Sequence, residues 1–178
     1  MKEMTCMQKA KKNIVLTGFM GTGKTTVGKL LAAELGYEFI DTDKLIEVRC
    51  GRSIPEIFRE SGESAFRSME ADIVRELAER EGLVIATGGR LMLEPANAAA
   101  LSRKGLVFCL VATPDVIVSR LKKNHQSRPL LNVPDHGERI VELLQQRAEG
   151  YACFHQVMTN DKNPKEITKE LFDLIQAD

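Results

Sequence analysis

The chain has 178 residues, 43% of them hydrophobic and 28% charged, an ordinary composition for a globular protein with one full core. Lys and Arg together number 25, as do Asp and Glu, so no excess of positive charge points to nucleic acid or an anionic membrane as a partner. The four cysteines are too widely spaced for a C-x-x-C motif, and no run of about 18 apolar residues occurs. We therefore expect residues 1–178 to form a single domain of a cytoplasmic, monomeric protein that acts on small molecules.

The first clear motif runs from Gly18 to Thr25 and fits the pattern G-x-x-x-x-G-K-[S/T]. A short apolar run at 13–17 precedes it, and apolar residues at helical spacing follow it as far as Gly36. In such a loop the glycines let backbone N–H groups surround phosphate oxygens at the start of a helix. The motif predicts that Lys24 contacts the β and γ phosphates of a nucleotide and that the Thr25 hydroxyl is a ligand of Mg²⁺.

Strand-like and helix-like segments alternate along the rest of the chain, which predicts an α/β fold with a parallel sheet. The expected further strands are residues 37–41, 83–87, 106–111 and 156–159. The expected helices are residues 44–50, 53–61, 63–81, 95–104, 114–121, 138–149 and a last one from 164. Between them, residues 124–137 contain two prolines and no periodicity, so we predict a mobile segment there.

Two carboxylates, Asp41 and Asp43, come at the end of the second expected strand, where ligands of open parallel sheets bind. Because the residues are two apart in an extended segment, both side chains point to one side. One of them is placed to hold Mg²⁺ through water, and the other to accept a proton from an attacking hydroxyl. The alternative is an Asx turn that caps the helix at Lys44; the neighbouring phosphate loop favours the catalytic interpretation.

Two charged residues fall on the apolar faces of predicted helices, and a third lies beside one of them. A helical wheel places Glu70 inside the stripe that contains Phe66 and Ile73, with Arg67 beside it. Arg147 lies likewise in the middle of an apolar face. A structural Arg–Glu pair and bonds to backbone carbonyls are the simpler explanations. An inward arginine also suits a substrate carboxylate, which matches the planar guanidinium.

Together these motifs resemble the shikimate kinase family, a relative of the nucleoside monophosphate kinases. The resemblance covers residues 13 to about 170. It rests on Gly-Thr-Gly-Lys-Thr-Thr at 21–26, Phe-Ile-Asp-Thr-Asp at 39–43, Gly-Glu-Ser-Ala-Phe-Arg-Ser-Met-Glu at 62–70, Thr-Gly-Gly at 87–89, Arg-Pro-Leu-Leu at 128–131 and Arg-Ala-Glu-Gly-Tyr at 147–151.

The resemblance implies a three-layer α/β/α fold with a five-stranded parallel sheet in the order 2-3-1-4-5. It also implies substrate-binding helices at about 44–71 and a lid at about 122–134. The implied reaction is transfer of phosphate from ATP, with Mg²⁺, to the 3-hydroxyl of shikimate, which gives shikimate 3-phosphate for aromatic amino acid synthesis.

The resemblance also assigns roles to individual residues. Asp43 resembles the group that activates the hydroxyl, and Arg67 and Arg147 resemble a clamp for the acceptor carboxylate. The other expected substrate contacts are Gly88 and Gly89, with Arg128 as a catalytic lid residue and Asp41 beside Thr25 at the metal. The expected nucleotide contacts are Gly21, Thr22, Gly23, Lys24, Thr25, Thr26, Arg120 and Arg128.

One position departs from the family pattern, because Arg90 follows Gly88 and Gly89 where three glycines are usual. We expect the Arg90 side chain to lie along the wall of the substrate pocket. The departure keeps open a kinase that acts on another small hydroxylated acid. A third possibility, a nucleotide-dependent regulator without phosphotransfer, has less support because the strand at 83–87 ends without a Walker B acid.

Overall fold

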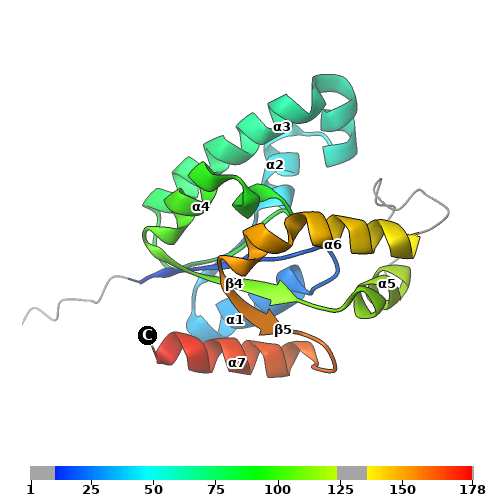
Figure 1. Ribbon diagram of the computed structural model, residues 1–178. Coiled ribbons are helices and arrows are strands. Elements are labelled where there is room, and N and C mark those ends of the chain that lie inside the picture. Colours follow the sequence, from blue (N-terminus) through cyan, green and yellow to red (C-terminus); the bar gives the residue numbers. More distant parts are fainter. Residues whose placement is uncertain (1–10, 124–135, 178) are drawn as a thin grey trace, which may run out of the picture.

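The computed structural model describes residues 11–123 and 136–177. Its centre is a five-stranded sheet in the order β2-β3-β1-β4-β5, in which every pair of neighbours is parallel (Figure 1). This confirms the order expected from the sequence. The strands are β1 (Asn13–Thr17), β2 (Glu38–Asp41), β3 (Leu83–Ala86), β4 (Gly105–Val111) and β5 (His155–Met158).

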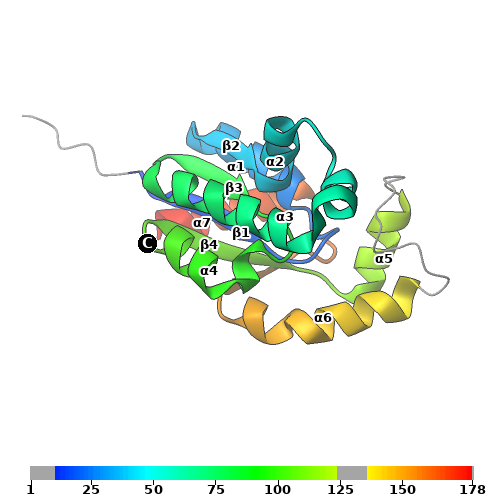
Figure 2. The same ribbon diagram turned by 90° about the horizontal axis from the view of Figure 1, so that it is seen from above.

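Helices cover both faces of the sheet and complete a three-layer α/β/α arrangement (Figures 1 and 2). They are α1 (Lys24–Leu35), α2 (Thr42–Cys50), α3 (Ile54–Glu79), α4 (Pro95–Ser102), α5 (Pro114–Lys123), α6 (His136–Ala152) and α7 (Pro164–Gln176), with a short 3₁₀ turn, η1 (Leu91–Leu93). In the described part of the chain, no helix is both long enough and apolar enough to cross a bilayer.

The apolar side chains of the central strands divide between the two faces. In β1, Ile14 and Leu16 pack with α1 and α7, whereas Val15 packs with α2, α3 and α4. This alternation follows from the two-residue period of a strand, and burial on both faces explains why the strand sequences are apolar throughout. A third cluster packs α5 and α6 against Phe19 of the phosphate loop, which fixes the position of α6 beside that loop.

Most predicted elements are confirmed, with bounds that differ by a few residues at several ends. Helix α2 begins at Thr42, not at Lys44, so Asp43 lies in the first turn of that helix and not in an extended segment as expected; the Asp41 side chain, which accepts from the Lys44 N–H, caps the helix there. The helices expected on either side of Gly62 form one continuous element, α3, but Gly62 itself is non-helical with φ 80° and ψ 170°. The predicted break is therefore present as a kink. Helix α6 begins at His136, two residues inside the segment for which we predicted no helix. The remainder of that segment, 124–135, lies outside the described residues.

The phosphate loop depends on a close approach between Gly18 and β4. Gly18 has φ +129°, and a Cβ atom there would lie 2.2 Å from the carbonyl oxygen of Leu110. Since that oxygen belongs to the backbone of a central strand, it has little freedom to move.

We expect Gly18→Ala to lower the free energy of unfolding by at least about 2 kcal/mol, because it adds both a steric clash and an unfavourable φ. Gly36→Ala is the matched control, since Gly36 has φ +66° but no atom within 4 Å of the added Cβ. It should cost only about 1 kcal/mol. Urea denaturation of both variants measures the difference. Equal losses would show that the contact with Leu110 is unimportant.

Candidate active site

The phosphate loop holds its shape through its own polar groups. The Lys24 ammonium donates to the carbonyl oxygens of Gly18 and Phe19 at 2.8 and 2.9 Å, and the buried Thr22 hydroxyl also donates to Phe19. Helix α1 starts at Lys24, and its N-cap residue, Gly23, has no side chain to cap the first N–H groups. Such a helix start carries partial positive charge and suits phosphate.

The side chains of Thr25 and Asp41 meet directly beside the loop. The Thr25 hydroxyl donates to Asp41 Oδ2 at 2.8 Å, and Asp41 Oδ1 accepts from the backbone N–H of Lys44 at 3.2 Å. Asp41 therefore caps α2, as the alternative interpretation of the sequence predicted, and also faces Thr25. Hydroxyl and carboxylate oxygens are hard donors of the kind that Mg²⁺ accepts, and Mg²⁺ needs only one or two from the protein when phosphates and water complete its shell.

The Asp43 carboxylate lies against the turn that follows β3. A Cβ atom at Gly88 would come within 2.4 Å of Asp43 Oδ1 and 3.3 Å of Glu70 Oε1. The Gly88 N–H donates to the hydroxyl of Thr42 at 3.0 Å, which ties this turn to the start of α2. The structure thus brings Asp43, Gly88 and Glu70 together. Thr42, which lies between Asp41 and Asp43, had no role in the sequence-based prediction, because a lone threonine carries no signal of its own.

Glu70 is a buried carboxylate, 2% exposed, as its place on the helical wheel predicted. Arg67 Nη1 donates to Glu70 Oε2 at 2.5 Å, so the predicted Arg–Glu pair is confirmed. Burial raises the pKa of the Glu70 carboxyl; Arg67 opposes that shift, and the neighbouring Asp43 adds to it. The side chain of Arg67 is still 32% exposed, so the pair leaves part of this guanidinium within reach of a ligand.

From the other side, α6 brings Arg147 and Tyr151 to the same turn. The Arg147 guanidinium lies 5.3 Å from the centre of the Phe19 ring, and its Nη1 is 3.5 Å from the point where a Cβ of Gly89 would be. The Tyr151 hydroxyl donates to the carbonyl oxygen of Gly89. Burial raises the pKa of Tyr151, which keeps this donor protonated, although Arg147 opposes the shift. Tyr151 ends the Arg-Ala-Glu-Gly-Tyr motif at 147–151, but the sequence-based prediction assigned a role only to Arg147.

Arg120 reaches from α5 to the phosphate loop. It donates to the carbonyl oxygen of Gly21 at 3.3 Å and to the hydroxyl and carbonyl oxygens of Thr159 at 2.9 and 2.6 Å. These bonds connect α5, the loop and the end of β5, and a nucleotide contact of Arg120 stays a prediction. Of the predicted lid, residues 122 and 123 end α5, and the rest, including Arg128, lies outside the described residues.

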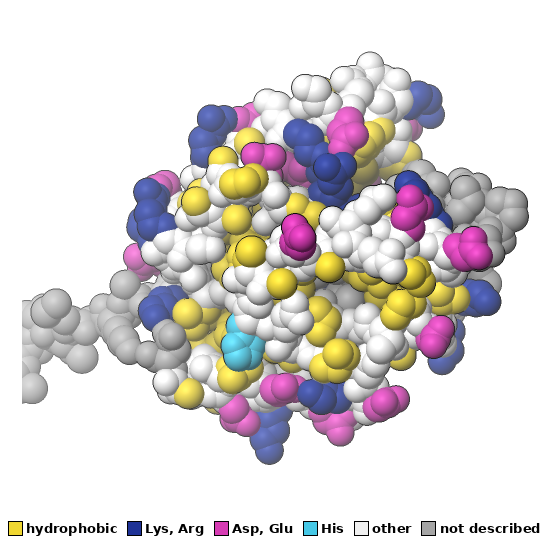
Figure 3. All heavy atoms as spheres, in the orientation of Figure 1, with side chains coloured by type: hydrophobic (Ala, Val, Ile, Leu, Met, Phe, Trp, Pro, Cys, Tyr) yellow, Lys and Arg dark blue, Asp and Glu magenta, His cyan; other side chains and the backbone are white. Residues whose placement is uncertain are grey.

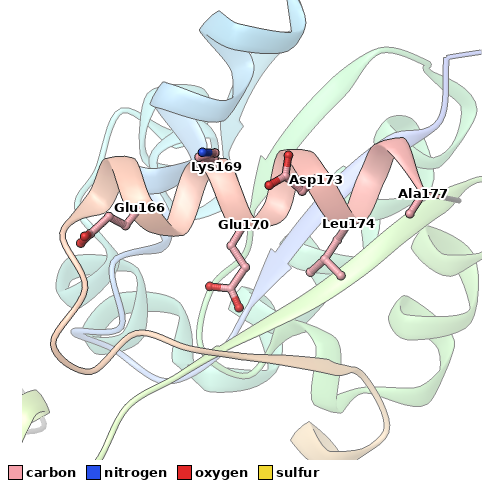
Figure 4. A pocket seen from close by; sticks show the side chains of 6 residues that line it. All are labelled: Glu166, Lys169, Glu170, Asp173, Leu174 and Ala177. Carbon is pink, nitrogen blue, oxygen red and sulfur yellow. The ribbon is translucent and has the colours of Figure 1, made fainter.

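Arg90 lies at the edge of a hollow of about 370 Å³ between α3 and the segment from η1 to α4. Arg67 and Glu70 line the same hollow, and Arg90 Nη1 is 3.0 Å from Glu63 Oε1. Figure 3 shows basic and acidic side chains side by side over this upper part of the molecule. A second hollow is a shallow surface on α7 that contains none of the predicted site residues (Figure 4).

A glycine-rich phosphate loop that joins the central strand of this parallel sheet to its first helix defines a P-loop nucleotide-binding protein. The model of the family described as shikimate kinase matches residues 20–176. The chain therefore belongs to the shikimate kinase family.

Individual relatives agree with this assignment. The chain is 45% identical to the shikimate kinase of Thermodesulfovibrio yellowstonii over 161 residues, which are 90% of this chain and 92% of that protein. It is also 45% identical to the shikimate kinase of Caldanaerobacter subterraneus, with coverages of 90% and 94%. Among solved structures, shikimate kinase from Acinetobacter baumannii in complex with shikimate superposes with a TM-score of 0.86, at 36% identity and 94% coverage of each chain.

The burial of Glu70 predicts a particular dependence of stability on pH. Since its pKa in the folded protein is raised above the ordinary value of 4.5, the folded state holds this proton more tightly than the unfolded state. The contribution of Glu70 to the free energy of unfolding should therefore be full below pH 4.5 and should fall as pH rises through the folded pKa.

Urea denaturation of wild type and Glu70→Gln across this range measures the effect, because the variant lacks the titrating group. Wild type should lose stability relative to Glu70→Gln as pH rises. Glu79→Gln is the control, since contacts with Lys104 and Arg103 lower the pKa of Glu79. Wild type should therefore gain stability relative to Glu79→Gln as pH rises, which is the opposite direction. If wild type keeps the same stability relative to Glu70→Gln as pH rises, or gains stability relative to it, the prediction is wrong.

Proposed function

We propose that this protein transfers the γ-phosphoryl group of ATP to the 3-hydroxyl of shikimate, forming shikimate 3-phosphate and ADP for aromatic amino acid synthesis. One observation carries the proposal beyond family membership. The turn at Gly88 and Gly89 has the Asp43 carboxylate against one residue and the Arg147 guanidinium against the other. A base for a hydroxyl and a cation for a carboxylate are thus both present at one turn, beside the phosphate loop.

On the nucleotide side, the reaction needs positioning and neutralisation of charge more than covalent chemistry. We assign phosphate binding to the backbone of residues 21–26 and to the Lys24 ammonium, which must exchange its bonds with loop carbonyls for phosphate oxygens. Mg²⁺ would be held by the Thr25 hydroxyl and, through water, by Asp41. When bound, the ion supplies positive charge to the phosphate oxygens.

On the acceptor side, Arg67 and Arg147 would clamp the shikimate carboxylate by charge-assisted hydrogen bonds. Gly88 and Gly89 would let the ring approach the backbone. The 3-hydroxyl oxygen then attacks the γ-phosphorus, the bond from that phosphorus to the β,γ-bridging oxygen breaks, and Asp43 accepts the hydroxyl proton.

The remaining assignments are of the same kind. We propose a single P-loop kinase domain over residues 1–178, with acceptor-binding helices at about 44–71 and a lid at about 122–134 that carries Arg128 to the phosphates. Arg120 would contribute to the nucleotide site through the loop carbonyl it already holds. The cytoplasmic location and the monomeric state expected from the sequence stay predictions.

The alternative acceptor, another small hydroxylated acid, has one observation in its favour: the guanidinium of Arg90 lines the hollow next to Arg67. Both candidates require a carboxylate on the substrate, so a panel of hydroxylated acids that includes shikimate distinguishes them.

The decisive experiment is ADP release in the presence of ATP, Mg²⁺ and shikimate. We expect wild type to release ADP only when shikimate is present. Lys24→Ala should lower turnover by about tenfold or more while the protein stays folded, because one cation is lost from a dry, charged site. Thermal melting checks the fold. Absence of shikimate-dependent ADP release from wild type, with release on another acid, would transfer the function to that acid.

Asp43→Asn tests the proposed base separately. The amide has the same shape but cannot take a proton, so turnover should fall by about 100-fold or more while the affinity for ATP is retained. Steady-state kinetics together with calorimetric titration of ATP give both quantities. Loss of ATP affinity with normal turnover at saturation would instead place Asp43 at the metal or the nucleotide.

A further inference from the structure

Four charged side chains of alternating sign form a continuous row at the acceptor side of the molecule. Arg90 Nη1 lies 3.0 Å from Glu63 Oε1, and the same oxygen accepts from Arg67 Nη2 at 3.1 Å and from Arg67 Nε at 3.3 Å. Arg67 Nη1 then donates to Glu70 at 2.5 Å. A single oxygen of Glu63 is therefore shared between two arginines.

This row occupies Arg67 with carboxylates of the protein itself. Each of its three guanidinium nitrogens already has a carboxylate partner: Nε and Nη2 have Glu63, and Nη1 has Glu70. A guanidinium binds a carboxylate best through two parallel N–H bonds. Either bidentate arrangement, through Nε and Nη2 or through Nη1 and Nη2, uses Nη2, which already donates to Glu63. An acceptor carboxylate bound in this way to Arg67 therefore shares that nitrogen with a carboxylate of the protein and is repelled by its charge.

The two glutamates differ greatly in how easily they can leave Arg67. Glu70 is 2% exposed, so its separation from Arg67 would leave a buried charge without a partner, which is strongly unfavourable. Glu63 is 53% exposed and keeps a second cation, Arg90, when it leaves. The acceptor carboxylate therefore displaces Glu63, not Glu70.

Glu63 and Arg90 come from separate elements that the fold brings together. Glu63 directly follows the kink at Gly62, where the second part of α3 begins, and Arg90 precedes η1. The backbone of Arg90 has φ −118° and ψ −8°, a conformation open to residues with a side chain. The position therefore does not require glycine, and its arginine is available as a partner for Glu63.

We propose that Glu63 is a placeholder for the acceptor carboxylate on Arg67, and that Arg90 is a positioning residue that holds Glu63 aside when the acceptor binds. The inference rests on the proposed function, because it takes Arg67 as part of the carboxylate clamp. Arg90 thereby changes acceptor affinity without touching the acceptor.

The two residues then have opposite effects on acceptor binding. Removing the charge of Glu63 removes the competitor, so shikimate should bind more tightly. Without Arg90, Glu63 in the free protein still pairs with Arg67. In the complex, the acceptor carboxylate occupies Arg67 and Glu63 has no cation left, so shikimate should bind less tightly. When Glu63 is already uncharged, removing Arg90 should have no effect.

A double-mutant cycle tests this dependence. Calorimetric titration of shikimate gives Kd, and steady-state kinetics give KM and kcat, for wild type, Glu63→Gln, Arg90→Met and the double variant. We expect Glu63→Gln to lower Kd and Arg90→Met to raise it, each by about two- to fivefold, as is usual for exposed ion pairs. In the Glu63→Gln background, Arg90→Met should leave Kd unchanged. KM for shikimate should follow Kd, and KM for ATP should not.

Arg103→Met is the matched control, since Arg103 is an exposed arginine paired with Glu79 at another part of the surface. It should leave the Kd for shikimate unchanged. An equal rise in Kd on Arg90→Met in both backgrounds would show that Arg90 binds the acceptor itself, and an equal fall would show that it is a barrier; either overturns the proposal. If wild type neither binds nor phosphorylates shikimate, the proposed function fails as well. If wild type phosphorylates shikimate but the effects of Glu63→Gln and Arg90→Met on Kd simply add, only the proposed role of Glu63 and Arg90 is wrong.

Discussion

The arrangement of charged groups around the turn after β3 depends on one buried ion pair, between Glu70 and Arg67. A carboxylate that is 2% exposed is unfavourable unless it has a partner, and Arg67 supplies the charge and a hydrogen bond. In return, Glu70 fixes one end of the Arg67 guanidinium and lies against both Asp43 and Gly88. The buried carboxylate thus determines where the cation of α3 stands relative to the turn after β3.

The strand order explains why the residues that we assign to the nucleotide and to the acceptor are neighbours. β1 lies between β3 and β4, and β3 also pairs with β2, so the carboxyl ends of β1, β2 and β3 share one edge of the sheet. The phosphate loop follows β1, the two aspartates end β2 or follow it, and the Gly88 turn follows β3. Packing of α5 and α6 on Phe19 then adds Arg147 from a distant part of the chain.

What the sequence predicts well is local or periodic. The phosphate loop is a contiguous motif, and the inward positions of Glu70 and Arg147 follow from the helical period. The resemblance to a family supplied the strand order.

The sequence does not predict contacts between distant residues that have no periodic signal. Examples are Thr42 with Gly88, Tyr151 with Gly89, and Glu63 with Arg90. Long side chains can reach several partners, so only the folded structure selects one. For Asp41, the capping and metal-binding interpretations are compatible, because one carboxylate both caps α2 and faces Thr25.

The contact between Gly88 and Asp43 has a consequence for how the proposed acceptor pocket can change during evolution or in a designed library. The space where a side chain at 88 would begin is already filled by the carboxylate of Asp43. Position 88 therefore cannot be used to reshape this space while Asp43, the proposed base, is kept, and variation at the two positions is linked. Position 90, whose backbone accepts a side chain, is free of that restriction, so diversity of acceptors among related chains should concentrate one step further along the same turn.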